Sequence, residues 1–428
     1  MRFCSLGWAM VFLALGTSIP TLSARTAEPD KIYTLDRPPT EVADALRDLL
    51  ADDIGKRRAA GRALARLPSA EPYLRHFRTT AAGKGDGFAG DALDELARRR
   101  GEQVVERAPQ WGKDGRFDLL VDASLHLTAD QADKVAEQFF AIGKAVRPVP
   151  EKMGGPKCKY GLGADHAGVL LKRRELFRLH APDHPVETDM ATWGFVRARA
   201  CETTAPKLFR WLFVTRDSLR GAHAEQNEWE NCYVFHNGKL VLDDINWSLV
   251  VCDGDVECVN QAHLNGCVVI ARGSIRCQPD LRFPQSNLYA QGDIIAKGSH
   301  TSDGLLFAGG KIDVPAFGKG AKERVEKAGV KECPFPVRFF ETADVGVEAA
   351  FKDGKLTVAK LTPGSPLAKH GVKEGDVVTR VNDKDITSAD DFRRELRYSV
   401  ALEAGILHIT RSDQKVTRVV YFKNGLEK

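Results

Sequence analysis

The residues best suited to chemistry lie between positions 109 and 230. This stretch holds side chains of the kinds that hydrolases use as bases and nucleophiles: His126, His166, Asp165, Cys158 and Cys201. No standard motif connects them, because the chain lacks G-x-S-x-G, H-E-x-x-H, G-x-x-x-x-G-K-[ST], and a G-x-G-x-x-G that follows a strand. The sequence therefore contains candidate residues for a hydrolase, but no known motif that would arrange them as an active site.

Two clusters contain residue types that bind metals. His180 and His184 have His-x-x-x-His spacing, but the two prolines of "HAPDHP" predict a loop, so the spacing does not place both on one helix face. A second, acidic cluster is better explained by a solvent-exposed helix: His223, Glu225, Glu228 and Glu230. We expect neither a metal nor another cofactor.

The amino-terminus has the layout of a secretory signal peptide. Arg2 precedes an apolar run at 6–16, and small residues follow around Ala24. The run is short for a membrane-spanning helix, and no later segment is long and apolar enough to be one. We expect removal of residues 1–24, with retention of this segment as an anchor as the alternative, and a protein that is exported to the periplasm or the extracellular space and has no transmembrane helix after removal of the signal.

The composition is that of a globular protein. The chain has 428 residues, of which 43% are hydrophobic and 28% charged, with a net charge of only +4. This small charge, with acids interleaved among the arginines of 55–107, argues against nucleic-acid binding. The eight cysteines that follow Cys4 contain no C-x-x-C, and their even number suits either disulfides or buried thiols in an exported protein.

The first half of the chain predicts helices followed by a mixed region. Alanine- and leucine-rich patterns at 40–53, 55–67 and 89–100 predict helices that resemble HEAT repeats, with a small helical bundle as the alternative. Further on, "RFDLLVDASLHL" predicts one strand or two, and 128–146 a helix that begins with a Thr128/Gln131 capping box. The segments "TWGFVRARACE" and "KLFRWLFVTRD" predict strands. We therefore expect an α+β region.

A repeat runs through the next part of the chain. Gly254, Gly273, Gly292 and Gly310 are 19, 19 and 18 residues apart, and an aliphatic residue stands two positions after each glycine. This period predicts a parallel β-solenoid with glycines at its corners, and an antiparallel meander is the alternative. The pattern resembles short right-handed β-helices of bacterial polymer-forming proteins, which leaves self-association through the solenoid open. In it, Cys258 and Cys277 occupy equivalent positions, as a disulfide or as stacked thiols.

The last part of the chain has a distinct order of elements. From Asp344 onward the sequence predicts two strands around the turn "KDG", a helix capped by Ser365, and a strand that ends at Asn382-Asp383. A helix capped by Ser388 and two closing strands follow. The segments "VGV", "LTPGSPLAKHGVKEGDVV" and "VNDKDITSADDF" resemble, in order and spacing, the circularly permuted PDZ domain of bacterial HtrA-like proteases. The protease's own G-N-S-G-G motif is absent.

The resemblance implies a peptide groove between the strand "GVEAA" and the second helix. A ligand would add there as a further strand, and a terminal carboxylate would meet backbone N–H groups of the preceding loop. Transferred by position, the loop, strand and helix residues are Asp344, Val345, Gly346, Val347, Glu348, Ala349, Phe392 and Leu396. Phe392 and Leu396 have core positions as their alternative role. Asp344 places a negative charge where a carboxylate would bind, which favours an internal peptide segment over a terminus.

These expectations define a multidomain chain and two functional hypotheses. The predicted order is a signal peptide at 1–24, a helical region at 28–108, an α+β region at 109–230, solenoid repeats at 231–316, a linker at 317–342 and a PDZ domain at 343–425. The first hypothesis is an exported, non-enzymatic scaffold that binds peptides or protein tails. The alternative is a PDZ-regulated hydrolase with its site in 109–230.

Overall fold

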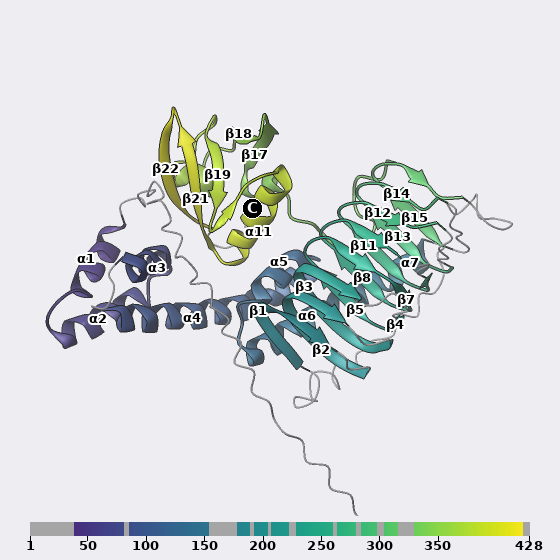
Figure 1. Cartoon of the computed structure of the whole chain (residues 1–428), viewed down its shortest axis with the longest axis horizontal. Helices are drawn as coiled ribbons and strands as arrows, with labels where there is room; N and C mark the ends of the chain where they lie inside the picture. Colours follow the sequence, from purple (N-terminus) through teal and green to yellow (C-terminus); the bar gives the residue numbers. More distant parts are fainter. Residues whose placement is uncertain are drawn as a thin grey trace, which may run out of the picture.

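The computed structural model describes ten stretches of the chain: residues 38–80, 85–153, 178–188, 192–203, 207–221, 228–259, 263–279, 284–297, 304–315 and 329–422. Three parts follow one another (Figure 1): helices, a parallel β-solenoid, and a C-terminal module with an antiparallel sheet. The signal peptide predicted at 1–24 lies outside the described residues. Among the described helices, none has the length and hydropathy to cross a bilayer.

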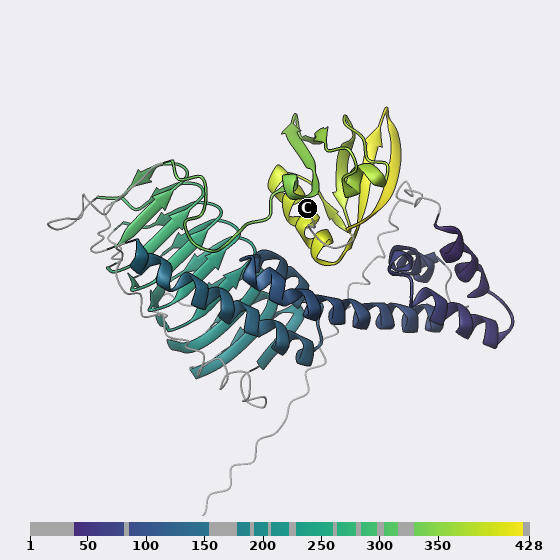
Figure 2. The same cartoon turned by 180° about the vertical axis from the view of Figure 1, so that it is seen from behind.

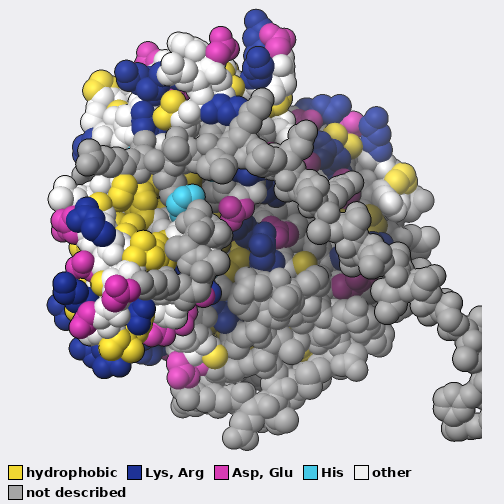
Figure 3. Space-filling model, turned by 60° about the vertical axis from the view of Figure 1, so that its left-hand side comes forward, with side chains coloured by type: hydrophobic (Ala, Val, Ile, Leu, Met, Phe, Trp, Pro, Cys, Tyr) yellow, Lys and Arg dark blue, Asp and Glu magenta, His cyan; other side chains and the backbone are white. Residues whose placement is uncertain are grey.

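The amino-terminal helices form a small core of their own. Its elements are α1 (Thr40–Asp48), α2 (Ile54–Leu64), η1 (Pro68–Ala70), α3 (Glu71–Thr80) and the long α4 (Asp86–Lys113). Asp53 caps α2 by accepting a hydrogen bond from the Lys56 N–H at 2.7 Å. In the view of Figure 3, the described part of the surface carries basic and acidic side chains next to one another.

Helix α4 leads into three helices that cover one face of the solenoid (Figure 2). They are α5 (Phe117–Ser124), α6 (Ala129–Val146) and α7 (Pro148–Lys152). The capping box at the start of α6 is confirmed. The strand predicted for "RFDLLVDASLHL" is wrong, because most of this segment is α5, whose eight residues are all buried. This short helix is surrounded by protein and buries Asp118 and Asp122 together with its apolar residues, so no solvent-exposed polar face marks a helical period in its sequence.

The solenoid is parallel, as its repeat predicted, and the antiparallel alternative is excluded. One face stacks β5 (Tyr233–His236), β8 (Leu249–Cys252), β11 (Val268–Ala271), β13 (Asn287–Ala290) and β15 (Leu305–Ala308). The opposite face stacks β6 (Leu240–Leu242), β9 (Val256–Cys258), β12 (Ile275–Cys277), β14 (Ile294–Ile295) and β16 (Ile312–Asp313). A third set of short strands closes the early coils: β4 (Glu228–Glu230), β7 (Asp244–Asn246) and β10 (Leu264–Asn265).

The repeated glycines stack directly on one another. The Gly273 N–H donates to the Gly254 carbonyl at 2.9 Å, and the Gly292 N–H donates to the Gly273 carbonyl at 3.0 Å. A Cβ on Gly254 would lie 2.1 Å from the Gly238 carbonyl oxygen of the coil below. Close approach of neighbouring coils therefore requires glycine at this corner.

The parallel ladder begins earlier than the repeat indicated. The strands β1 (Arg178–Thr188), β2 (Thr192–Thr203) and β3 (Lys207–Gly221) pair in parallel. The long strand β3 in turn pairs in parallel with both β5 and β6. The strands expected in an α+β unit are thus part of the solenoid sheet. The loop predicted at "HAPDHP" is also wrong, since it belongs to β1, an edge strand with an irregular register at Pro185 that tolerates proline.

Seven cysteines lie within the described residues, and all are free thiols. Cys258 and Cys277 are register partners on adjacent coils, so the stacked-thiol alternative describes them. Cys158 lies outside the described residues.

The C-terminal module is a small sheet with two helices. Its elements are η2 (Thr342–Val345), β17 (Val347–Lys352), β18 (Lys355–Leu361), α10 (Pro366–Lys369), β19 (Val377–Val381), β20 (Lys384–Asp385), α11 (Ala389–Ala401), β21 (Ala404–Arg411) and β22 (Gln414–Tyr421). The sheet order is β17-β18-β19-β21-β22, so β17 lies at an edge. Ser365 and Ser388 cap α10 and α11, as predicted.

The module contacts both other parts of the protein. Val419 of β22 joins the core of the amino-terminal helices, and the Tyr421 hydroxyl donates to the Ser69 carbonyl at 2.9 Å. On the other side, Phe339, in the segment that leads into the module, packs against Phe117 of α5, with ring centroids 5.7 Å apart. The C-terminal module is therefore fixed between the helices and the solenoid.

Candidate functional site

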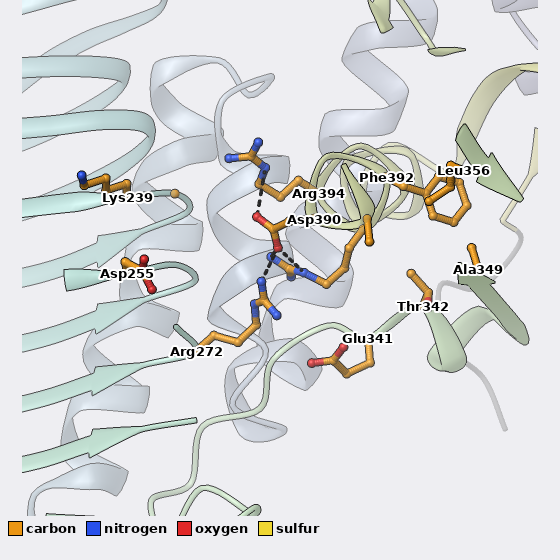
Figure 4. A pocket seen from close by; sticks show the side chains of 13 residues that line it. Lys239, Asp255, Arg272, Glu341, Thr342, Ala349, Leu356, Asp390, Phe392 and Arg394 are labelled. Carbon is orange, nitrogen blue, oxygen red and sulfur yellow. Dashed lines mark hydrogen bonds and ion pairs between the residues drawn. The ribbon is translucent and has the colours of Figure 1, made fainter. Parts of the chain in front are cut away.

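The site predicted from the sequence is a groove between β17 and α11, and the structure contains a cavity there. The cavity has a volume of about 610 Å³ and extends from the C-terminal module to the corners of the solenoid (Figure 4). Its lining comes from both parts: Gly238, Lys239, Asp255, Arg272, Glu341, Thr342, Ala349, Leu356, Ala389, Asp390, Phe392, Arg393 and Arg394. One wall thus belongs to the module and the other to the solenoid.

The wall on the module has an apolar part beside charged side chains of α11. The apolar part consists of Ala349 of the edge strand, Leu356 of β18 and Phe392 of α11, and the charged side chains are Asp390, Arg393 and Arg394. Of the two predicted helix residues, Phe392 lines the cavity although its side chain is almost fully buried. Leu396 is fully buried in the core, so the alternative role noted for it is the correct one. Glu348 is exposed on the same strand and pairs with Lys360 at 3.1 Å.

The predicted carboxylate-binding loop is wound into the 3-10 helix η2. Two of its N–H groups are already used: that of Asp344 donates to the Glu341 carbonyl at 2.9 Å, and that of Gly346 to the Ala343 carbonyl at 3.0 Å. Gly346 has a φ of 71°, and a Cβ there would lie 2.8 Å from the Ser365 Cβ. Val345 and Val347 are buried. In this conformation the loop does not present a set of open donors to a carboxylate.

Asp344 does not aim a free negative charge at the groove. Its carboxylate accepts hydrogen bonds from Arg116 at 3.2 Å and from Arg338 at 3.1 Å. Arg116 immediately precedes α5, which lies outside the module. The loop that flanks the groove is therefore held by an ion pair to the body of the protein.

Helix α11 is held to the body by buried ion pairs. Asp253, on a solenoid corner, accepts two hydrogen bonds from Arg393 at 3.0 and 2.9 Å and also bonds Arg397. Arg397 donates to Asp122 of α5 at 2.7 Å. The side chains of Asp122, Asp253 and Arg397 are completely buried. Burial alone would raise the pKa of Asp122, but Arg397 and Arg216 hold that pKa below its ordinary value.

Two further ion pairs extend this set. Arg216 of β3 donates to Glu395 at 2.8 Å, while Arg272 of the solenoid contacts Asp253 at 3.0 Å and bonds Asp390 of α11. Burial raises the pKa of Glu395, and Arg216 opposes that shift. We call the whole set the docking network; it pairs four acids with four arginines: Asp122, Asp253, Asp390, Glu395, Arg216, Arg272, Arg393 and Arg397.

One feature of the sequence points to this network. Arg393 and Arg397 are four residues apart, which places them on one face of the predicted helix, beside the stripe of Phe392 and Leu396. Arginines next to an apolar stripe are usually solvated, and only the fold shows that acids from two distant segments face them. Asp253, on a solenoid corner, is the central acceptor.

The candidate hydrolase residues have other contacts where the structure describes them. The His126 imidazole is hydrogen-bonded to the Tyr398 hydroxyl of α11. Cys201 lies in the core of the solenoid, where burial raises the pKa of its thiol to about 12. Cys158, Asp165 and His166 lie outside the described residues. Within the described stretches, no group of three or more His, Cys, Asp or Glu side chains is arranged to hold a metal ion.

Comparison with protein families supports the assignment of the C-terminal module. The family model of the PDZ domain matches residues 343–417. No curated protein matches the chain. The C-terminal module is therefore a PDZ domain, and the domain class is one that binds peptides and protein segments.

Proposed function

We propose that the protein is an exported, non-enzymatic adaptor that binds an extended peptide segment in the groove of its PDZ domain. The observation that carries the proposal is the position of β17. This strand is the edge of its sheet, and the cavity lies beside it, with Ala349, Leu356 and Phe392 as the apolar part of a largely charged lining. An edge strand has unpaired main-chain donors and acceptors, so a peptide can add to it as a further strand.

The state of the loop supports an internal segment as the ligand rather than a chain terminus. The N–H groups of Asp344 and Gly346 donate within η2, and a terminal carboxylate would have to break those bonds. Strand addition to β17 does not need them, because it uses the main chain of 347–352. The apolar part of the lining, Ala349, Leu356 and Phe392, then contacts one apolar side chain of the ligand.

The solenoid suits the role of a rigid support. Its coils form two in-register ladders, and its interior is filled by stacked apolar side chains and thiols. A PDZ domain fixed against such a body is held at a constant place relative to the ends of the solenoid. The scaffold part of the proposal rests on this rigidity, and self-association through the solenoid would multiply the number of grooves.

Export is proposed from Arg2, the apolar run and the small residues around Ala24. Its test is to express the complete chain, fractionate the cells, and determine the amino-terminal sequence of the mature protein. Cleavage near Ala24 with recovery outside the cytoplasm supports export. An uncleaved cytoplasmic chain contradicts it.

The binding experiment selects peptides from a random linear library displayed on phage, using the mature chain as bait. Ala349→Trp places a bulky side chain in the part of the cavity beside β17 and should abolish enrichment. Ala350→Trp is the matched control, because Ala350 is the next residue of the same strand, is exposed and is absent from the cavity lining. Equal enrichment by wild type and Ala349→Trp would place the binding surface elsewhere.

A further inference from the structure

We propose that the docking network restrains the two elements that flank the groove, so that residues outside the PDZ domain lower its affinity for peptides. This inference rests on the proposed function, since it concerns the same groove. It assigns a regulatory contact to Arg272 and Asp390, which join the solenoid to α11 at the cavity (Figure 4).

Both elements that flank the groove are held by groups outside the PDZ domain. Helix α11 is fixed through Arg393 and Arg397 to Asp253 and Asp122, and the loop before β17 is fixed through Asp344 to Arg116. A peptide that adds to β17 must lie between these two elements. The width of the groove is therefore set by contacts to α5 and the solenoid, in addition to the packing of the module itself.

Two residues of the PDZ domain, and Arg272 of the solenoid, belong to both the cavity and the network. Asp390 and Arg393 line the cavity, and the same side chains bind Arg272 and Asp253 of the solenoid. A ligand cannot displace the first turn of α11 without disturbing these ion pairs. Binding and docking are thus coupled through shared residues, and the coupling acts equally in both directions.

The Arg272–Asp390 pair is the part of the network that can be removed with little damage. The Asp390 side chain is 46% exposed and that of Arg272 is 20% exposed. Without Arg272, Asp253 keeps its bonds to Arg393 and Arg397. Without Asp390, Arg272 keeps its contact with Asp253. Neither change leaves a fully buried charge alone, so both variants should fold.

The experiment compares Arg272→Gln and Asp390→Asn with Arg276→Gln in the mature chain. Arg276 is the matched control: it lies on the same solenoid, pairs with Asp255 at 2.9 Å and lies outside the docking network. The probes are fluorescent peptides synthesised from the sequences that the phage selection enriches with wild type and with Arg272→Gln. We expect Arg272→Gln and Asp390→Asn each to bind the peptides about fivefold more tightly than wild type. The double variant should bind no more tightly than either single variant, and Arg276→Gln should match wild type.

A second measurement does not depend on a ligand. Amide hydrogen exchange at Thr342–Val347 and at Ala389–Arg393 should be faster in Arg272→Gln than in wild type and unchanged in Arg276→Gln. Enriched peptides that bind Arg272→Gln and Asp390→Asn no more tightly than wild type, or unchanged exchange in both segments, would overturn the restraint. Absence of any enriched peptide with either bait would instead refute the proposed function, and the exchange data would still decide whether the contact restrains the groove.

Discussion

The solenoid and the joint between the PDZ domain and the body bury their surfaces in opposite ways. The solenoid interior consists of apolar side chains and thiols that repeat from coil to coil. The joint buries Asp122, Asp253 and Arg397 completely, in a network that occurs once. Apolar stacking is insensitive to small shifts, whereas a buried ion pair requires exact partners. The comparison indicates that the solenoid supplies stability and the joint supplies a defined orientation.

The largest effect should follow from removing the central acid of the joint. Asp253→Asn removes the acid that Arg393 and Arg397 share, which leaves Arg397 with Asp122 and Arg393 with the half-exposed Asp390, and we expect a loss of about 3 kcal/mol in the free energy of unfolding. Chemical denaturation measures it. Asp255→Asn, two residues away at an exposed pair with Arg276, is the control and should cost less than about 1 kcal/mol. Equal losses in the two variants would show that the joint does not depend on its buried charge.

A cavity in the solenoid should cost no more. Leu288 is fully buried on β13 between Val269 and Leu306 of the neighbouring coils. Leu288→Ala should lower the free energy of unfolding by about 3 kcal/mol, also measured by denaturation. Peptide binding at the groove should stay at the wild-type level under conditions where the chain is folded. A loss of binding without a loss of stability would mean that the two regions are not separate in function.

Acid should weaken the solenoid through His236. Burial lowers the pKa of this histidine from 6.5 to about 4, and its ring nitrogens bond Thr215 at 2.8 Å and the Lys239 carbonyl at 3.0 Å. Between these two pH values the unfolded chain binds more protons than the folded chain, so stability falls as the pH drops, by at most about 3 kcal/mol. Unfolding curves across this window measure the slope. His236→Gln should flatten it, and an unchanged slope in that variant would assign the effect to other groups.

The smallest effect concerns the second contact of the PDZ domain, on the amino-terminal helices. Tyr421→Phe removes one neutral hydrogen bond to the Ser69 carbonyl, and we expect a loss of about 1 kcal/mol in the free energy of unfolding. Binding of the enriched peptides should not change, because Tyr421 lies on β22, at the edge of the sheet opposite β17. A change in affinity similar to that of Arg272→Gln would extend the restraint to this contact.

The sequence predicted features that depend on local or periodic rules. The spacing of Gly254 and its equivalents predicted the parallel coils, and Ser388 correctly marked the start of α11. It did not predict α5, since a helix buried on every side carries no period. For the groove, it placed Ala349 and Phe392 at the cavity but not Arg272 or Asp255. Those residues reach the groove only because a distant part of the chain folds against it, and no local pattern records that.

Helix α4 sets the relative rotation of the two hydrophobic cores to which it contributes side chains. Its first half contributes Ala89, Ala92 and Leu96 to the core of the amino-terminal helices, and its second half contributes Val104 and Trp111 to the main core. Each residue of an α-helix turns the chain by about 100° and advances it by about 1.5 Å. One residue inserted between the two halves would therefore turn one apolar face away from its partner. Because the PDZ domain contacts both cores, such an insertion would also change the orientation of the PDZ domain against them. The helix therefore sets an angular register between the two cores that side-chain repacking cannot restore.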